Sequence, residues 1–163
     1  MVVFKAQSLK GNQNVTYIFF DLGVMHTMLG IMAADIFLTT DVDFVNKGAA
    51  SEMFVGLEML KYHDCFLRPE MHYWQNMTKN SSAEVDYFIS KGGKVLPIEV
   101  KASTQGSMQS LWVFLRKKNL HNAIRTSLEN FDSFDYYDPD ADFAQRHVDI
   151  IPLYALSNLL NDM

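Results

Sequence analysis

The feature that most constrains the fold is a pair of adjacent glycines between two apolar runs. The run YFIS is followed by KGGK and then by VLPIE, so Gly92 and Gly93 lie at the centre of a predicted β-hairpin. A two-residue loop of type I′ needs positive φ at both central positions, which glycine adopts without steric cost. With these glycines as the loop, Lys91 pairs with Lys94, and each further pair lies one residue outward on both strands.

This register places four charged residues on one face of the hairpin. Counting outward from the loop, Asp86 faces Glu99, and Glu84 faces Lys101. Side chains alternate between the two faces of a strand, so Glu99 and Lys101 share a face. Facing residues have Cβ atoms roughly 4.5–5.5 Å apart. A three-residue loop would move Asp86 to the opposite face, so the prediction depends on the length of the loop.

Two opposed carboxylates repel each other, and a divalent cation between them would remove the repulsion. Carboxylate oxygens suit Mg²⁺, which takes one or two protein carboxylates and completes its octahedron with water and phosphate oxygens. Lys101 would then hold a phosphate oxygen or help to deprotonate a water that attacks a phosphodiester in line. The alternative is a plain cross-strand salt bridge between Glu84 and Lys101, with Asp86 and Glu99 on a solvated sheet face.

Composition fits one soluble globular domain over residues 1–163. Hydrophobic residues make up 48% and charged residues 20% of the chain, enough to build a sizeable core. The net charge of −5 argues against a general electrostatic grip on nucleic acid but is compatible with a local basic patch. The single cysteine, Cys65, forms no internal disulfide. Since no membrane-spanning run, signal peptide or P-loop is recognisable, we expect no membrane partner, a cytoplasmic location and no nucleotide site in this chain.

Helical and strand patterns alternate along the chain, which predicts an α/β fold with a mixed β-sheet flanked by helices. The expected strands, besides those of the hairpin at 84–89 and 94–102, lie at 15–20, 72–75, 122–127 and 148–156. The expected helices lie at 22–29, 48–63 and 109–118. The polar run 76–82 and the acidic, aromatic segment 130–146 are expected to be loops.

The remaining polar residues give weaker signals. The five histidines lack the i,i+4 spacing of a helical zinc site. The aspartates at 132–142 lack the glycine and closing glutamate of a calcium loop, so a solvated acidic loop is expected. The clearest basic run, 116–118, closes the helix at 109–118, where cations favour the negative end of the helix dipole. Tyr73 and Trp74 fit core packing better than stacking on bases.

The charged residues of the hairpin also match a known pattern. Asp86, twelve intervening residues and then Glu99-Val100-Lys101 resemble the core of the PD-(D/E)xK, or restriction-endonuclease-like, nuclease superfamily, and Glu52 matches its helix glutamate. Six blocks resemble, in order, a C-terminal domain of unknown function of prokaryotic AAA-type ATPases. They cover about residues 17 to 157 and read FFDLGVMHTMLG, NKGAASEMFVGLEML, YWQN followed by SSAEVDYFI, VLPIEVKAS, SLWVFL and IIPLYAL.

This resemblance implies a restriction-endonuclease-like domain that stands C-terminal to an AAA-type ATPase domain. It implies that Asp86 and Glu99 bind Mg²⁺ or Mn²⁺, that Lys101 is the catalytic lysine, and that Glu52 assists the metal or a water. The implied activity is metal-dependent hydrolysis of nucleic acid. The alternative is a non-catalytic interaction domain on the same fold that contacts an ATPase or a second copy of itself, since fold alone does not prove catalysis. One departure is Gln75, which stands where relatives commonly carry a positive residue.

Overall fold

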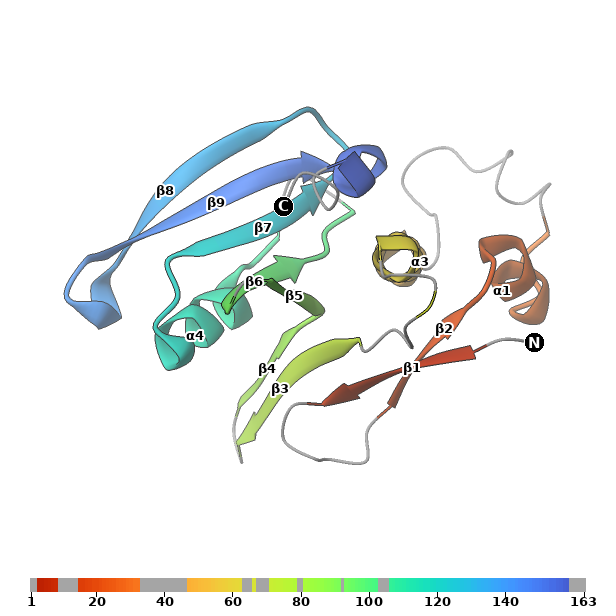
Figure 1. The fold of residues 1–163 in the computed structure, drawn as a ribbon, viewed down its shortest axis with the longest axis horizontal. Coiled ribbons are helices and arrows are strands. Elements are labelled where there is room, and N and C mark those ends of the chain that lie inside the picture. Colours follow the sequence, from red (N-terminus) through yellow and green to blue (C-terminus); the bar gives the residue numbers. More distant parts are fainter. Residues whose placement is uncertain are drawn as a thin grey trace.

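The chain forms an α/β domain with two β-sheets, shown in Figure 1. The structure is a computed structural model that describes residues 3–8, 15–32, 47–62, 66, 71–78, 81–91, 93–102 and 106–158. The larger sheet has five strands in the order β5-β6-β7-β9-β8. These strands span Tyr87–Lys91 (β5), Lys94–Glu99 (β6), Asn122–Ser127 (β7), Ala144–Pro152 (β9) and Asp132–Asp138 (β8). The sheet is mixed, because β6, β7 and β9 run parallel while β5 and β8 run antiparallel to their neighbours.

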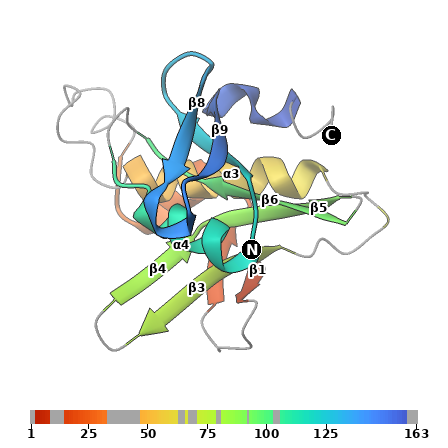
Figure 2. The same ribbon diagram turned by 90° about the vertical axis from the view of Figure 1, so that its left-hand side faces the viewer.

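The smaller sheet has four strands in the order β2-β1-β3-β4. They span Val15–Phe19 (β2), Val3–Ser8 (β1), His72–Thr78 (β3) and Ser81–Val85 (β4). Figure 2 shows β3 and β4 side by side, extending away from the body of the domain. Strand β4 leads through a single residue, Asp86, into β5 of the larger sheet, so Asp86 lies at the junction of the two sheets.

Different helices cover the two faces of the larger sheet. These helices are α3 (Lys47–Tyr62) and α4 (Gln109–Lys118), whereas α1 (Leu22–Met28) packs against α3 and β2. On β7, Ala123 packs in a cluster with Leu111 of α4, whereas the next residue, Ile124, packs in a cluster with Val55 of α3. The strand period of two therefore sends successive side chains into two separate cores. This confirms the predicted α/β architecture of a mixed sheet flanked by helices.

Local signals explain where several elements begin and end. The side chain of Asp21 accepts a hydrogen bond from the backbone N–H of Val24 (3.0 Å) and so caps α1 as predicted. Helix α4 ends at Lys118, where Asn119 adopts a left-handed backbone conformation with φ 50°. Two short 3-10 helices, Pro139–Ala141 and Leu153–Ala155 (η2), follow β8 and β9.

The two predicted loops were wrong. Within 76–82, β3 continues to Thr78 and β4 starts at Ser81, and the two strands pair antiparallel. Within 130–146, β8 and the start of β9 form a second antiparallel pair. In β8 the half-buried Phe134 and Tyr136 pack against Trp112 of α4. The alternate residues of the strand, Ser133, Asp135 and Tyr137, are exposed. The polar residues on the open face of these strands therefore gave each segment the composition of a loop.

The acidic segment also contributes a buried ion cluster. Asp138 is only 1% exposed and lies 3.5 Å from Arg116 and 3.9 Å from Arg146, so the expectation of a fully solvated acidic loop was wrong for this residue. Arg146 also donates to the carbonyl of Leu120. These contacts link the C-terminal end of α4 to β8 and β9. No helix in the described part of the chain is both long enough and apolar enough to span a bilayer.

Candidate active site at the junction of the two sheets

The hairpin register that the two glycines predicted is confirmed. Lys91 pairs with Lys94, and the ladder continues outward to Tyr87 and Ile98. Gly93 adopts φ 77°, the left-handed region that the turn requires, and Gly92 lies outside the described residues. Because Asp86 and Glu99 come directly after the last pair, the same count brings them to the same end of the hairpin.

The predicted pairing of Glu84 with Lys101 was wrong. The chain leaves the β5–β6 ladder at Asp86, and Glu84 in β4 pairs instead with Gln75 in β3. Lys101, which follows the end of β6, binds Glu99 two residues earlier, with 2.8 Å between Nζ and Oε1. The Glu84–Lys101 salt bridge of the alternative interpretation is therefore absent from the described residues, and Lys101 pairs with Glu99 within the candidate site.

Asp86 is held at the junction by the backbone of the neighbouring strand. Its Oδ2 accepts a hydrogen bond from the backbone N–H of Val100 at 2.7 Å. Burial, followed by repulsion from Glu99 and Glu52, raises the pKa of Asp86 from 3.8 to about 8. The hydrogen bond and the charge of Lys101 act in the opposite direction and lower this pKa, but they are the smaller effects. Asp86 is therefore a carboxyl that carries a proton near neutral pH unless a cation approaches.

Glu99 is the most deeply buried carboxylate of the group, with 4% of its surface exposed. Burial raises its pKa, while the hydrogen bond and charge of Lys101 and the charge of Arg125 lower it. Its second oxygen, Oε2, is buried and has no hydrogen-bond partner within the described residues. A buried carboxylate oxygen without a partner costs free energy, and a cation bound to it would offset that cost.

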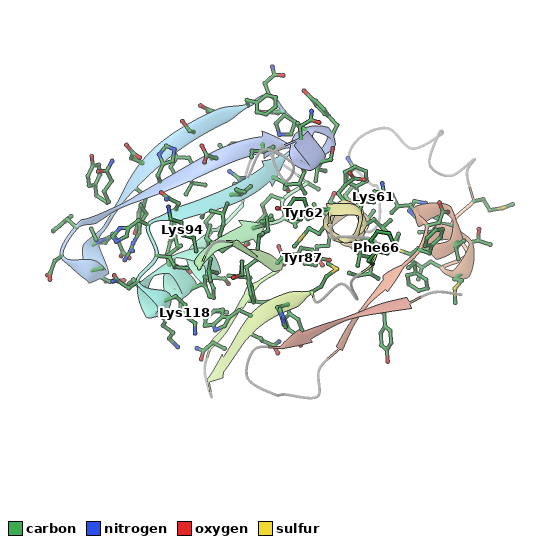
Figure 3. All side chains as sticks on the ribbon, viewed as in Figure 1. Lys61, Tyr62, Phe66, Tyr87, Lys94 and Lys118 are labelled. Carbon is green, nitrogen blue, oxygen red and sulfur yellow. The ribbon has the colours of Figure 1, made fainter. Side chains whose placement is uncertain are left out.

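Glu52 extends the site onto α3. Its pKa is raised by burial and then by the charge of Glu84, and the charge of Lys101 lowers it. The hydroxyl of Tyr87 donates to the backbone carbonyl of Glu52 (3.0 Å), and Figure 3 labels Tyr87 beside α3. The helix approaches this closely because residue 56 is glycine: a Cβ there would lie 2.8 Å from the Tyr87 hydroxyl oxygen. The charge of Glu52 in turn raises the pKa of Asp86, so the helix carboxylate acts electrostatically on the residue to which the resemblance linked it.

Glu84 is a further acidic residue of the site that the sequence assigned to a salt bridge. Much of its surface on β4 is exposed, but partial burial of the carboxyl raises its pKa. Its charge raises the pKa values of both Glu52 and Glu99. The signal was present as the pattern Glu84-x-Asp86, which places two carboxylates at the point where the strand changes sheets. Gln75, the unusual residue noted above, pairs with Glu84, so this neighbour is an amide rather than a cation.

Lys101 is positioned by contacts along its backbone. Its N–H donates to Oγ1 of Thr126 (3.0 Å), and that hydroxyl donates to the carbonyl of Lys101 (3.3 Å). These hydrogen bonds hold the chain beyond β6 against β7, although neither Val100 nor Lys101 belongs to the strand. The backbone of Lys101 is consequently held at the carboxyl ends of two parallel strands, β6 and β7.

The donor set at this site fits a cation that needs few protein ligands. No group of three or more histidine, cysteine, aspartate or glutamate side chains is arranged around a metal position in the part of the chain that the structure describes. Asp86 and Glu99 supply two carboxylates, and Mg²⁺ commonly uses one or two, with water and phosphate oxygens as the remaining ligands. The unpartnered Oε2 of Glu99 and the raised pKa of Asp86 are both features that a divalent cation would compensate.

The fold and this site define an α/β domain with several acidic side chains and one lysine at the carboxyl ends of its parallel strands. The chain belongs to a family described as a domain of unknown function, DUF4143, whose model matches residues 47–156. The match includes α3, both hairpin strands and all four residues selected from the sequence: Glu52, Asp86, Glu99 and Lys101. No curated protein and no solved structure matches the chain.

Proposed function

We propose that this domain is a restriction-endonuclease-like phosphodiesterase that hydrolyses nucleic acid with Mg²⁺ or Mn²⁺, as an accessory to an AAA-type ATPase. The observation that carries the proposal is the buried Oε2 of Glu99, which has no hydrogen-bond partner among the described residues. The same carboxylate pairs with Lys101 through Oε1 and raises the pKa of Asp86. The order of Asp86, Glu99 and Lys101 matches the PD-(D/E)xK pattern, which is what connects this arrangement to phosphodiester chemistry.

In this mechanism Asp86 and Glu99 would hold the cation through their carboxylate oxygens, with Asp86 in its deprotonated form. The bound ion would polarise the phosphate as a Lewis acid and lower the pKa of a water. Lys101 exchanges Oε1 of Glu99 for a non-bridging phosphate oxygen, to which it donates, and its charge offsets the charge that develops there. Glu52, whose pKa is raised by burial, accepts a proton from the attacking water as the new P–O bond forms, and the sugar oxygen of the broken P–O bond leaves with a proton from solvent water.

A cleavage assay with matched variants tests the proposal. Wild-type protein incubated with labelled single-stranded and double-stranded DNA and RNA should cleave at least one substrate in Mg²⁺ or Mn²⁺, and none in EDTA. Lys101→Met and Asp86→Asn should each reduce the rate by about 10²-fold or more. Glu52→Gln should also reduce it, whereas Glu58→Gln, on the same helix but paired with Lys61, should leave it unchanged. Equal rates in wild type and Lys101→Met would refute the assignment.

A second candidate function is a non-catalytic interaction domain that contacts the ATPase or another copy of this chain. The observation that favours it is the charge of the site: the carboxyl groups of Glu52, Glu84, Asp86 and Glu99 outnumber the nearby cations Lys101 and Arg125. Gln75 stands beside Glu84, and the chain carries a net charge of −5. This charge repels a polyanion in the absence of metal. An inert wild type that binds the ATPase domain in solution would support this function in place of hydrolysis.

A further inference from the structure

A shallow, open hollow lies at the end of the larger sheet where Lys101 lies, beyond the carboxyl ends of the parallel strands. It is a hollow of about 480 Å³, within the range of about 300–1,000 Å³ typical of small-ligand sites. We call it the aromatic hollow, and it is lined by Leu128, Glu129, Asn130, Phe131, Asp132 and Tyr154. These residues come from the β7–β8 connection, from the first residue of β8 and from η2.

The aromatic hollow presents large apolar side chains to solvent. Leu128, Phe131 and Tyr154 are 58%, 63% and 71% exposed, respectively. Tyr154 is followed by the buried residues Ala155 and Leu156, which anchor its backbone in the core. The loop is fixed at its start, because Oγ of Ser127 accepts a hydrogen bond from the backbone N–H of Glu129 (3.0 Å). Exposed apolar groups on a fixed backbone are typical of a binding surface.

Hydrogen bonds connect this hollow to the candidate active site. Thr126 exchanges hydrogen bonds with the backbone of Lys101, and the hollow begins two residues later at Leu128. Strand β9, which leads to Tyr154, is the next strand along, since Ser127 pairs with Pro152. Two strand spacings amount to about 10 Å. A nucleic acid strand whose phosphate lies at Lys101 would therefore place another of its bases, one to a few nucleotides along the strand, at the hollow.

The polar residues of the hollow select the part of a nucleotide that fits. Glu129 and Asp132 repel phosphate but accept hydrogen bonds from the amino groups of bases, and Asn130 both donates and accepts. Phe131 and Tyr154 offer rings on which a base can stack. The ligand that fits this surface is therefore an unstacked base whose phosphate lies outside the hollow.

We propose that the aromatic hollow binds one unpaired nucleobase of the strand whose phosphate lies at Lys101. This inference rests on the proposed function, because it assumes a nucleic acid substrate, and it names single-stranded regions or ends as the substrate class. It also assigns Tyr154 and Phe131 as the residues that stack on the base. Neither residue carries the phosphodiester chemistry, so strand binding and cleavage can be tested separately.

Fluorescence anisotropy with two matched strands tests this proposal. One is a labelled single-stranded DNA, and the other is a strand of equal length with abasic positions throughout, both measured in Ca²⁺, which also binds carboxylate oxygens. Wild type should bind the base-bearing strand about 5- to 100-fold more tightly than the abasic strand. Tyr154→Ala and Phe131→Ala should lose that preference, while Tyr154→Phe, which keeps the ring, should retain it. Tyr17→Ala, which removes a 66% exposed tyrosine of β2, should behave as wild type.

Two results would overturn the inference in distinguishable ways. If wild type cleaves or binds the strand and Tyr154→Ala shows the same preference for bases, the aromatic hollow is not a base site, and a protein partner becomes its occupant. If wild type neither binds nor cleaves any strand in Ca²⁺, Mg²⁺ or Mn²⁺, the proposed function fails and this inference fails with it.

Discussion

Replacing Asp86 with asparagine should change how the stability of the protein depends on pH. A carboxyl with a raised folded-state pKa is still protonated in the folded protein at pH values where the unfolded chain has lost the proton. The folded state then binds more protons, so the free energy of unfolding falls as the pH rises between the two pKa values. For Asp86 that window runs from 3.8 to about 8. Asparagine keeps an oxygen that accepts the Val100 N–H but removes the titration.

The expected size follows from the pKa shift. Each pH unit inside the window costs the wild type about 1.4 kcal/mol relative to a non-titrating residue. Between pH 5 and pH 7, the free energy of unfolding of Asp86→Asn should therefore gain about 2–3 kcal/mol on that of wild type. The pKa values of three other carboxyl groups are also raised, but these groups are present in both proteins. Their contribution to the free energy of unfolding therefore enters both curves at each pH; they are Glu52, Glu84 and Glu99.

Urea unfolding in EDTA, followed by fluorescence of the two tryptophans, measures this difference. Asp142→Asn is the matched control, because Asp142 is exposed and asparagine tolerates its left-handed backbone, φ 49°. Its curve of stability against pH should run parallel to that of wild type. Parallel curves for wild type and Asp86→Asn would refute the account of Asp86 as a buried, repelled carboxyl.

Two further predictions concern packing and the buried ion cluster. Gly56→Ala should lower the free energy of unfolding by about 1–3 kcal/mol, because the new Cβ would lie 2.8 Å from both Ile18 and Tyr87; an unchanged urea midpoint would contradict this close approach. Asp138→Ala should cost about 3–5 kcal/mol, because it leaves the 2% exposed Arg146 as an uncompensated buried charge. A loss below 1 kcal/mol in the same urea assay would show that the cluster stabilises little.

The hairpin was predictable because its loop is local. Two glycines fix the loop length, the loop length fixes the register, and the register places Asp86 next to Glu99 without any knowledge of the rest of the fold. The helix that carries Glu52 was predictable from its apolar period. The point at which the β5–β6 pairing ends was not predictable. The chain passes from one sheet to the other at Asp86, and Glu84, before it, pairs with Gln75 of β3.

The segments that were missed depend on contacts remote in sequence. In β8, the half-buried Phe134 and Tyr136 pack against Trp112 of α4, a residue about twenty positions earlier in the chain. In the β3–β4 pair, Ala83 is buried in the same cluster as residues of α4. The local sequence does not show that a distant helix packs on one face of these strands. The polar and acidic residues on the other face therefore determined the prediction.

Calorimetric titration with Mn²⁺ or Mg²⁺ tests the central claim most directly. We predict that wild type binds about one ion per chain at pH 7 and releases protons, because Asp86 must lose its proton to bind a metal. The measured enthalpy should therefore depend on the ionisation enthalpy of the buffer. Asp86→Asn and Glu99→Gln should bind no ion, and Glu58→Gln should bind as wild type. Equal binding by all four proteins, or no binding by wild type at millimolar metal, would contradict the account.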